Sequence, residues 1–312
     1  MVEFGIQLGA PSAEEMGDRL DYYRSLLDVA PDVFRSAWLS DHLMKDDFPM
    51  YEGWTALTYL AALHPTYRFG NLVLCQSYRN PALLAKMAAT LQHLTRGRLV
   101  LGIGAGWQAD EYLAYGYDYP DGAIRVAQLG EAIDILRAMW TDSPASFQGS
   151  HYRIERAYCE PRPEPMIPIL VGGRRPKLLR VAAQKADYWS WDGPISRYGP
   201  LVDALRRACA DVGRDFATIR LHAGGEAYFP ENPSGFPSAG ASSGTMASVT
   251  TAQDPLGLYA GEQDWVLGPR PEDAIAGLRP LVELGVEHVT IYFHDRRSAQ
   301  VFAQEVEPAF RP

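Results

Sequence analysis

Apolar runs of strand length alternate along the chain with longer amphipathic runs of helix length. The pattern predicts eight strands, near residues 3–8, 35–40, 68–74, 98–103, 167–172, 187–191, 218–223 and 288–293. It predicts helices over 13–29, 54–64, 81–95, 121–140, 176–185, 197–212 and 271–284, with a closing helix from about residue 297. This alternation is typical of βα units around a parallel sheet. Eight such units in 312 residues predict a single α/β domain over residues 1–312, a (β/α)8 TIM barrel.

Two segments interrupt the alternation, and we expect them to be insertions at the carboxyl-terminal face of the barrel. Residues 144–166 contain two short extended pieces, SFQG and HYRI, and then a proline-rich run, which indicates an excursion before the fifth strand. Residues 229–262 are rich in Gly, Ser, Pro and Ala and show little periodicity, so they predict a long loop after the seventh strand. Loops of this length are often functional, and we expect this one to cover a substrate pocket.

Composition and charge exclude several classes of protein. The net charge of −9 and the pI near 5.3 argue against a nucleic-acid or anionic-membrane partner, because both require a basic surface. No signal peptide and no apolar stretch long enough to cross a bilayer is present, so we expect a cytoplasmic protein. Cys75, Cys159 and Cys209 are widely spaced, which suits reduced thiols. The histidines show no metal-ligand spacing, so no metal is predicted.

The run RLVLGIGAGW, residues 98–107, predicts a buried strand that ends in a glycine-dense loop and is followed by an acidic helix start at Asp110-Glu111. Glycines at 102, 104 and 106 would let a planar or phosphorylated ligand approach bare backbone, although a tight strand-to-helix turn is the equal alternative. The dinucleotide fingerprint G-x-G-x-x-G fails because Trp107 occupies its third glycine position, and no G-x-x-x-x-G-K-[ST] run occurs. Any cofactor is therefore held differently.

Asp41 and His42 follow the second strand, at the rim where barrel enzymes carry their chemistry. An imidazole can give or take a proton near neutral pH. The alternative is that Asp41 caps a turn and His42 is an ordinary polar rim residue. Adjacent side chains point in different directions, so the spacing does not predict a direct bond between the two.

The fifth strand ends in Gly172-Gly173-Arg174-Arg175, and Pro176 then begins a helix. Bare amides, a helix amino terminus and two guanidiniums at one place favour an anion, so this segment is a phosphate-site candidate. A plain turn with solvated arginines is the alternative. The four tyrosines of DEYLAYGYDYP, residues 110–120, could line a pocket for a ring, but packing between helices is the interpretation that we favour for most of them.

Five motifs are shared with a known family: SDHL at 40–43, EGWTAL at 52–57, YRNPALLAKMAATL at 78–91, GRLVLGIGAGWQADEYLAYG at 97–116 and ILVGG at 169–173. Through them the chain resembles the luciferase-like oxidoreductases, TIM-barrel enzymes that depend on a flavin or a deazaflavin. The combination of SDHL and LGIGAGW is most similar to the branch that uses coenzyme F420. Members that use flavin mononucleotide (FMN) share the barrel.

The resemblance implies an oxidoreductase that transfers a hydride between F420 and a small organic substrate. His42 would lie near the hydride-transfer centre with Asp41 beside it, as the catalytic residues. A non-proline cis peptide between Leu72 and Val73 would form a bulge behind the central ring of the coenzyme. The implied coenzyme contacts are Leu72, Val73, Gly104, Ala105, Gly106, Trp107, Gly172, Gly173 and Arg174.

Two alternatives stay open: an FMN-dependent luciferase-like monooxygenase and a non-catalytic barrel that binds a flavin. The resemblance also suggests a homodimer. Sugar-phosphate dehydrogenases of this family carry a glutamate as general acid in the glycine loop, where this chain has Trp107. This departure argues against a sugar-phosphate substrate.

Overall fold

The computed structural model describes residues 2–9, 19–44, 50–232 and 266–311. These residues form two compact units. The first unit consists of Met1–Trp38, Ser190–Asp203 and Arg220–Pro312, and the second of Leu39–Trp189 and Ala204–Ile219. From residue 233 on, the predicted 229–262 loop lies outside the described residues, as do residues 13–18 of the first predicted helix.

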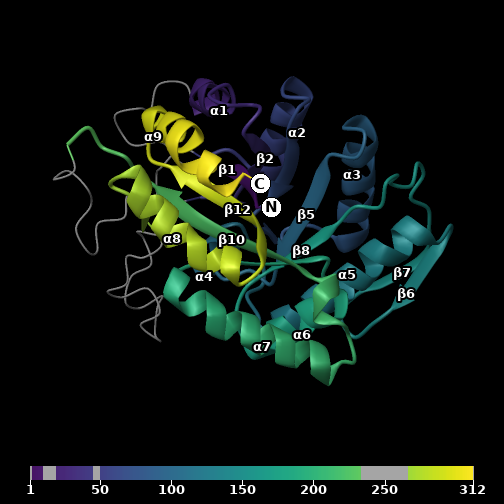
Figure 1. Cartoon of the computed structure of the whole chain (residues 1–312). Coiled ribbons are helices and arrows are strands. Elements are labelled where there is room, and N and C mark those ends of the chain that lie inside the picture. The colour runs from purple at the N-terminus through teal and green to yellow at the C-terminus, as the bar shows by residue number, and fades with distance from the viewer. Residues whose placement is uncertain (1, 10–18, 45–49, 233–265, 312) are drawn as a thin grey trace. The chain divides into compact units, whose positions relative to one another are not determined.

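The first unit is a parallel sheet with helices that follow its strands (Figure 1). Strand β12 pairs with β1 on one side and with β10 on the other, and the short strand β11 extends the sheet beyond β10. The strands are β1 (Glu3–Leu8), β2 (Phe34–Leu39), β10 (Arg220–Ala227), β11 (Val266–Leu267) and β12 (Val286–Phe293), and the helices are α1 (Arg19–Leu27), α8 (Pro271–Glu283) and α9 (Arg296–Val301). A π-helical turn, Phe302–Val306, and a 3-10 turn, Glu307–Phe310, follow α9.

A chain of buried polar groups lies within the first unit. The His222 ring is bonded through Nδ1 to Ser190 Oγ at 2.8 Å and through Nε2 to Thr290 Oγ1 at 2.7 Å. The neighbouring His288 ring is bonded to Ser36 Oγ at 2.8 Å. Burial lowers the pKa of His222 from 6.5 to about 3, because an imidazolium there would lose its solvation. His222 is therefore neutral in the folded protein.

The second unit is also a parallel sheet with helices between its strands. Strands β3 and β4 both pair with β5, and β5 pairs on its other side with β8. The strands are β3 (Arg68–Asn71), β4 (Leu74–Cys75), β5 (Leu99–Gly104), the hairpin β6 (Ala145–Gln148) and β7 (Arg153–Ala157), β8 (Ile169–Gly172) and β9 (Tyr188–Asp192), and the helices are α2 (Gly53–Leu63), α3 (Pro81–Leu94), α4 (Ala109–Ala114), α5 (Gly122–Thr141) and α6 (Pro176–Lys185). Strand β9 and helix α7 (Tyr198–Asp211) belong partly to each unit.

Local sequence explains these elements. All six residues of β5 are buried, as expected of a parallel strand covered on both faces. Helix α3 begins where predicted, because the Asn80 side chain caps the amides of Ala82 and Leu83 and Pro81 occupies the first turn. Helices α3, α5 and α6 pack in sequence along this unit (Figure 1). Each of the eight predicted strands is present, the third being divided into β3 and β4.

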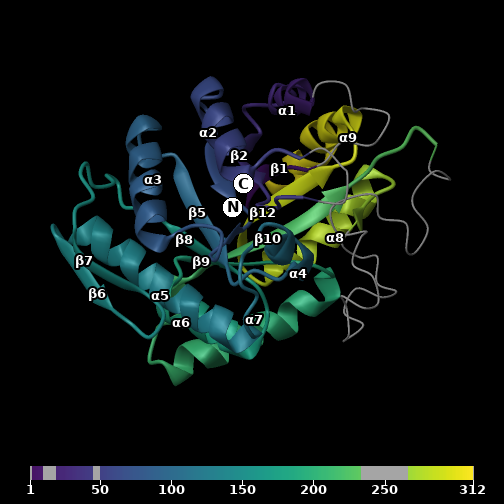
Figure 2. The same ribbon diagram turned by 180° about the vertical axis from the view of Figure 1, so that it is seen from behind.

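The predicted excursion at 144–166 contains the antiparallel hairpin β6–β7, which lies beside α5 (Figure 2). The carboxylate of Glu131 in α5 accepts hydrogen bonds from three successive amides at the hairpin tip, residues 150–152, at 2.7 to 2.9 Å. The hydroxyl of Tyr152 donates to Gln76 Oε1 at 2.8 Å. The hairpin tip is thereby attached to the segment that follows β4.

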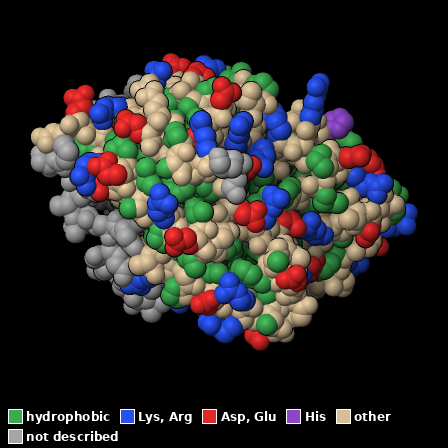
Figure 3. Space-filling model, in the orientation of Figure 1, with side chains coloured by type: hydrophobic (Ala, Val, Ile, Leu, Met, Phe, Trp, Pro, Cys, Tyr) green, Lys and Arg blue, Asp and Glu red, His purple; other side chains and the backbone are tan. Residues whose placement is uncertain are grey.

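On the face drawn in Figure 3, Lys and Arg side chains are interspersed with Asp and Glu. None of the described helices is long and apolar enough to cross a membrane.

Candidate active site

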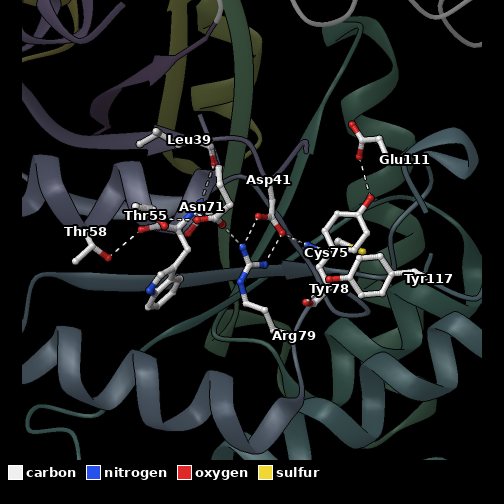
Figure 4. A network of polar contacts seen from close by, with 12 residues as sticks. Leu39, Asp41, Thr55, Thr58, Asn71, Cys75, Tyr78, Arg79, Glu111 and Tyr117 are labelled. Carbon is white, nitrogen blue, oxygen red and sulfur yellow. Dashed lines mark hydrogen bonds and ion pairs between the residues drawn. The ribbon is translucent and has the colours of Figure 1, made fainter. Parts of the chain in front are cut away.

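Asp41 follows β2 and is buried, with 5% of its surface exposed. Its carboxylate accepts hydrogen bonds from two guanidinium nitrogens of Arg79, both at 2.8 Å, and from the backbone N–H of Cys75 at 2.9 Å (Figure 4). This geometry is the bidentate arrangement that a guanidinium and a carboxylate favour. Asp41 therefore holds the segment after β4 against the end of β2.

Arg79 joins this pair to the start of α2. Its guanidinium also binds the carboxylate of Glu52, which accepts hydrogen bonds from the amides of Trp54 and Thr55 and so caps the helix. Burial lowers the pKa of Arg79, but the hydrogen bonds and charges of Asp41 and Glu52 outweigh burial and raise the pKa above its ordinary value. The guanidinium is therefore charged and occupied by two carboxylates.

His42 is bonded to Glu111 and not to Asp41. Its Nδ1 lies 2.8 Å from Glu111 Oε1, and Glu111 Oε2 accepts a hydrogen bond from the Tyr78 hydroxyl at 2.8 Å. The Glu111 side chain is 2% exposed and that of His42 is 22% exposed. Burial and the hydrogen bond to Glu111 raise the pKa of Tyr78 above its ordinary value, so this hydroxyl keeps its proton and donates a hydrogen bond to the carboxylate.

This arrangement fixes the tautomer of His42. An ionised carboxylate only accepts hydrogen bonds, so Nδ1 carries the proton that faces Glu111. The ring nitrogen Nε2 is then left as the acceptor. An imidazole oriented by a buried carboxylate can take a proton through Nε2 while the carboxylate stabilises the resulting positive charge. The geometry is suited to general acid–base chemistry.

The peptide between Leu72 and Val73 is cis, which confirms the expectation drawn from the family resemblance. The bulge divides β3 from β4, and three glycines surround it. A Cβ on Gly104 would lie 2.8 Å from one methyl of Val73, and a Cβ on Gly172 would lie 3.0 Å from the other. A Cβ on Gly102 would lie 1.9 Å from the carbonyl oxygen of Asn71. Close packing of the bulge therefore accounts for these glycines before any ligand is considered.

The glycine loop ends in an exposed tryptophan. Gly106 has a φ of +75°, which favours glycine, and a Cβ there would lie 2.0 Å from the Tyr112 hydroxyl. Trp107 is 51% exposed, and its ring meets that of His42 edge to face, with centroids 5.7 Å apart and planes at 85°. The glycine loop and the segment after β2 thus meet through Trp107 and His42.

The candidate phosphate segment lies between β8 and α6. Gly173 has a φ of +130°, and its carbonyl accepts a hydrogen bond from Trp189 Nε1 at 2.7 Å. Arg174 is half-buried, whereas Arg175, the N-cap of α6, is exposed and makes no side-chain cap. The amides of Leu178 and Leu179 donate to the backbone carbonyl of Arg175, both at 2.9 Å, and Pro176 has no N–H.

The tyrosines after the glycine loop mostly pack together, as favoured from the sequence. Tyr112 is fully buried, and its ring lies 5.0 Å from that of Tyr119 and 5.1 Å from that of Tyr78. Its hydroxyl lies 2.8 Å from Cys75 Sγ. Tyr115 is the exception, because it is 55% exposed.

Sequence reasoning missed four members of this site: Glu111, Tyr78, Arg79 and Glu52. Glu111 stood out only as part of an acidic helix start, which gave no sign of its contact with a histidine 69 positions earlier. No group of three or more potential metal ligands occurs among the described residues.

Comparison with known proteins places this chain in a family. The sequence profile of the luciferase-like monooxygenases matches residues 7–235. The chain belongs to the luciferase-like monooxygenase family. A curated relative, an F420-dependent glucose-6-phosphate dehydrogenase of Amycolatopsis mediterranei (strain U-32), is 26% identical over 330 aligned positions, which cover 96% of this chain and 97% of the relative.

Solved structures show the same fold. An F420-dependent secondary alcohol dehydrogenase, in complex with an F420-acetone adduct, superposes with a TM-score of 0.80 at 18% identity and covers 100% of this chain and 99% of its own. The F420-dependent tetrahydromethanopterin reductase of Methanopyrus kandleri gives a TM-score of 0.78 at 18% identity over 99% of each chain. The fold of this luciferase-like protein is thus a (β/α)8 TIM barrel, as its alternating strands and helices predict.

Proposed function

We propose that this protein is an F420-dependent oxidoreductase that transfers a hydride between the deazaflavin and a small organic substrate. Its family and the activities of the relatives named above support the proposal. The observation that carries it is the buried Glu111 carboxylate bonded to His42, beside the glycine loop. Such a pair provides the proton that must move when a hydride enters or leaves an alcohol or carbonyl carbon.

The residues present fit a phosphorylated planar cofactor. The half-buried Arg174 and the start of α6 follow the second glycine segment directly. Helix amino termini favour anions. We propose that Leu72 and Val73 support the central ring from behind, and that Gly104, Ala105, Gly106, the backbone of Trp107, Gly172, Gly173 and Arg174 hold the phosphate and tail.

When bound, the deazaflavin supplies the carbon that accepts or returns the hydride. His42 accepts the substrate hydroxyl proton through Nε2, or returns it in the reverse direction. Glu111 keeps Nδ1 protonated and stabilises the charged imidazole. Asp41, which the family resemblance implies to be catalytic, acts here as a positioning group, because its oxygens are bonded to Arg79 and the Cys75 amide.

His42→Ala tests these roles. The variant should bind F420 with roughly the wild-type affinity and lose turnover by about 10²- to 10⁴-fold, the usual contribution of a general acid or base. Loss of F420 binding by a folded variant would make His42 a cofactor contact, and full turnover would exclude it from proton transfer. Oxygen consumption with reduced FMN would favour a monooxygenase, and cofactor binding without turnover of any substrate would favour a non-catalytic barrel. A homodimeric state stays a prediction, which size-exclusion chromatography checks.

A further inference from the structure

Trp107 differs from the other described tryptophans in its exposure. It leaves 51% of its surface exposed, whereas no other described tryptophan exceeds 7%. Large apolar side chains are exposed singly on many surfaces, but this one has its edge-to-face contact with His42, the proposed proton acceptor. A molecule that reaches His42 therefore meets an indole.

The backbone that presents Trp107 is held at two points. The Tyr119 hydroxyl donates to the carbonyl of Trp107 at 2.8 Å, and Arg125 Nε donates to the carbonyl of Gly106 at 3.3 Å. The Arg125 guanidinium also lies 4.0 Å above the Tyr119 ring. The indole is thus carried by a fixed loop, which reduces the entropy lost when a ligand packs on it.

The charged groups around His42 are already paired. Within the described residues, the hydrogen bonds and ring contacts of His42 and Glu111 go to each other, to Tyr78 and to Trp107. The nearby guanidinium of Arg79 is 11% exposed and is bound by two carboxylates. A phosphate bound beside His42 needs a cation or converging amide donors, and no cation is among the described side chains in contact with His42.

On the basis of the proposed function, we infer that the substrate that meets His42 is a neutral alcohol or ketone with an apolar surface that packs on the Trp107 indole. It is not a phosphorylated sugar, the substrate in the name of the curated relative. For an alcohol, the carbinol carbon loses a hydride to F420, the hydroxyl proton passes to His42 Nε2, and the C–O bond becomes a carbonyl.

A binding experiment tests whether a neutral alcohol packs on the Trp107 indole, and it needs no turnover. Iodide quenching of tryptophan emission is measured on the F420-loaded protein with cyclohexanol or with glucose 6-phosphate, and Trp107→Phe provides the background from all other tryptophans. We expect cyclohexanol to protect the Trp107 emission from iodide and glucose 6-phosphate to have no effect. Protection by glucose 6-phosphate, or by neither compound, would overturn the inference. Failure of the wild type to bind F420 would instead contradict the proposed function.

Kinetics of three variants separate the role of the indole from that of exposed apolar surface in general. Trp107→Ala should lower kcat/KM for cyclohexanol by about 10- to 100-fold, the range for losing an apolar contact of this size, with the Kd for F420 unchanged. Trp107→Phe should retain most of the activity. Leu113→Ala removes another exposed apolar side chain, 68% exposed, and should have no effect. A weakened Kd for F420 in Trp107→Ala would place the indole on the cofactor and contradict the inference, as would unchanged kinetics.

Discussion

Glu111→Gln tests whether the buried carboxylate determines the reactivity of His42. In the wild type, one carboxylate oxygen accepts from His42 and the other from Tyr78, both at 2.8 Å. Glutamine has nearly the same shape, and its oxygen can still accept from His42 Nδ1–H. The Tyr78 hydroxyl can rotate to accept from the glutamine NH2 group. The substitution therefore removes the charge and keeps both contacts.

The expected fall in kcat follows from replacing a charged hydrogen-bond acceptor by a neutral one. A hydrogen bond to a charged group contributes about 1.5–3 kcal/mol and a neutral one about 0.5–1.5 kcal/mol, so the lost stabilisation of the imidazolium is about 1–2 kcal/mol. About 1.4 kcal/mol corresponds to tenfold in rate, which predicts a roughly 5- to 30-fold fall in kcat. The Kd for F420 should stay within about twofold, because the backbone around the glycine loop is unchanged.

The assay follows the visible absorbance of the deazaflavin with cyclohexanol, or with the neutral alcohol that the wild type oxidises fastest. Asp110→Asn is the matched control, because it removes an exposed carboxylate from the adjacent position. Wild-type kcat in Glu111→Gln would refute the claim that the Glu111 charge stabilises the His42 imidazolium. An equal loss in Asp110→Asn would show that the effect is one of general charge.

Three further predictions concern Arg79, Arg174 and His222, whose side chains are buried or half-buried. Arg79→Met leaves Asp41 buried without its cation and should lower the free energy of unfolding by about 3–5 kcal/mol, measured by urea denaturation; a loss below about 1 kcal/mol would contradict the ion pair. Arg174→Ala should weaken F420 binding by about 1–3 kcal/mol while Arg175→Ala, at an exposed position, has little effect; equal Kd values for both variants and the wild type would reject Arg174 as a phosphate ligand. Because burial lowers the pKa of His222 to about 3, the unfolded chain binds a proton below pH 6.5 that the folded protein does not, so stability falls as the pH drops from 6.5 toward 3. His222→Gln should reduce that slope by up to about 1.4 kcal/mol per pH unit, and an unchanged slope between pH 4 and 6, roughly the middle of this window, would exclude His222 as its source.

Most of the fold was predictable because the local hydrophobic pattern agrees with the strands and helices that form. Buried strands such as β5 are continuous apolar runs, and α3 carries its own start signals. The end of β10 was not predictable: the predicted strand stops at residue 223, before Gly224 and Gly225, yet the strand continues to Ala227. In the structure, a Cβ on Gly224 would lie 2.6 Å from the Cβ of Asp192, so that glycine permits close packing and does not end the strand.

The site was only partly predictable, since its partners are distant in sequence. His42 was identified from its position after a strand, but the pairing of Asp41 with Arg79 and of His42 with Glu111 spans 38 and 69 positions. Two adjacent residues thus serve separate networks, which spacing alone does not reveal. The cis peptide at Leu72–Val73 came from the family resemblance and is confirmed.

Titration of the purified protein with oxidised F420 and with FMN under identical conditions tests whether the protein depends on F420. We expect saturable binding of F420 with a Kd clearly below that of FMN. We also expect Arg174→Ala to raise the Kd for F420. Equal or tighter binding of FMN, or no binding of F420, would contradict the proposed dependence on F420.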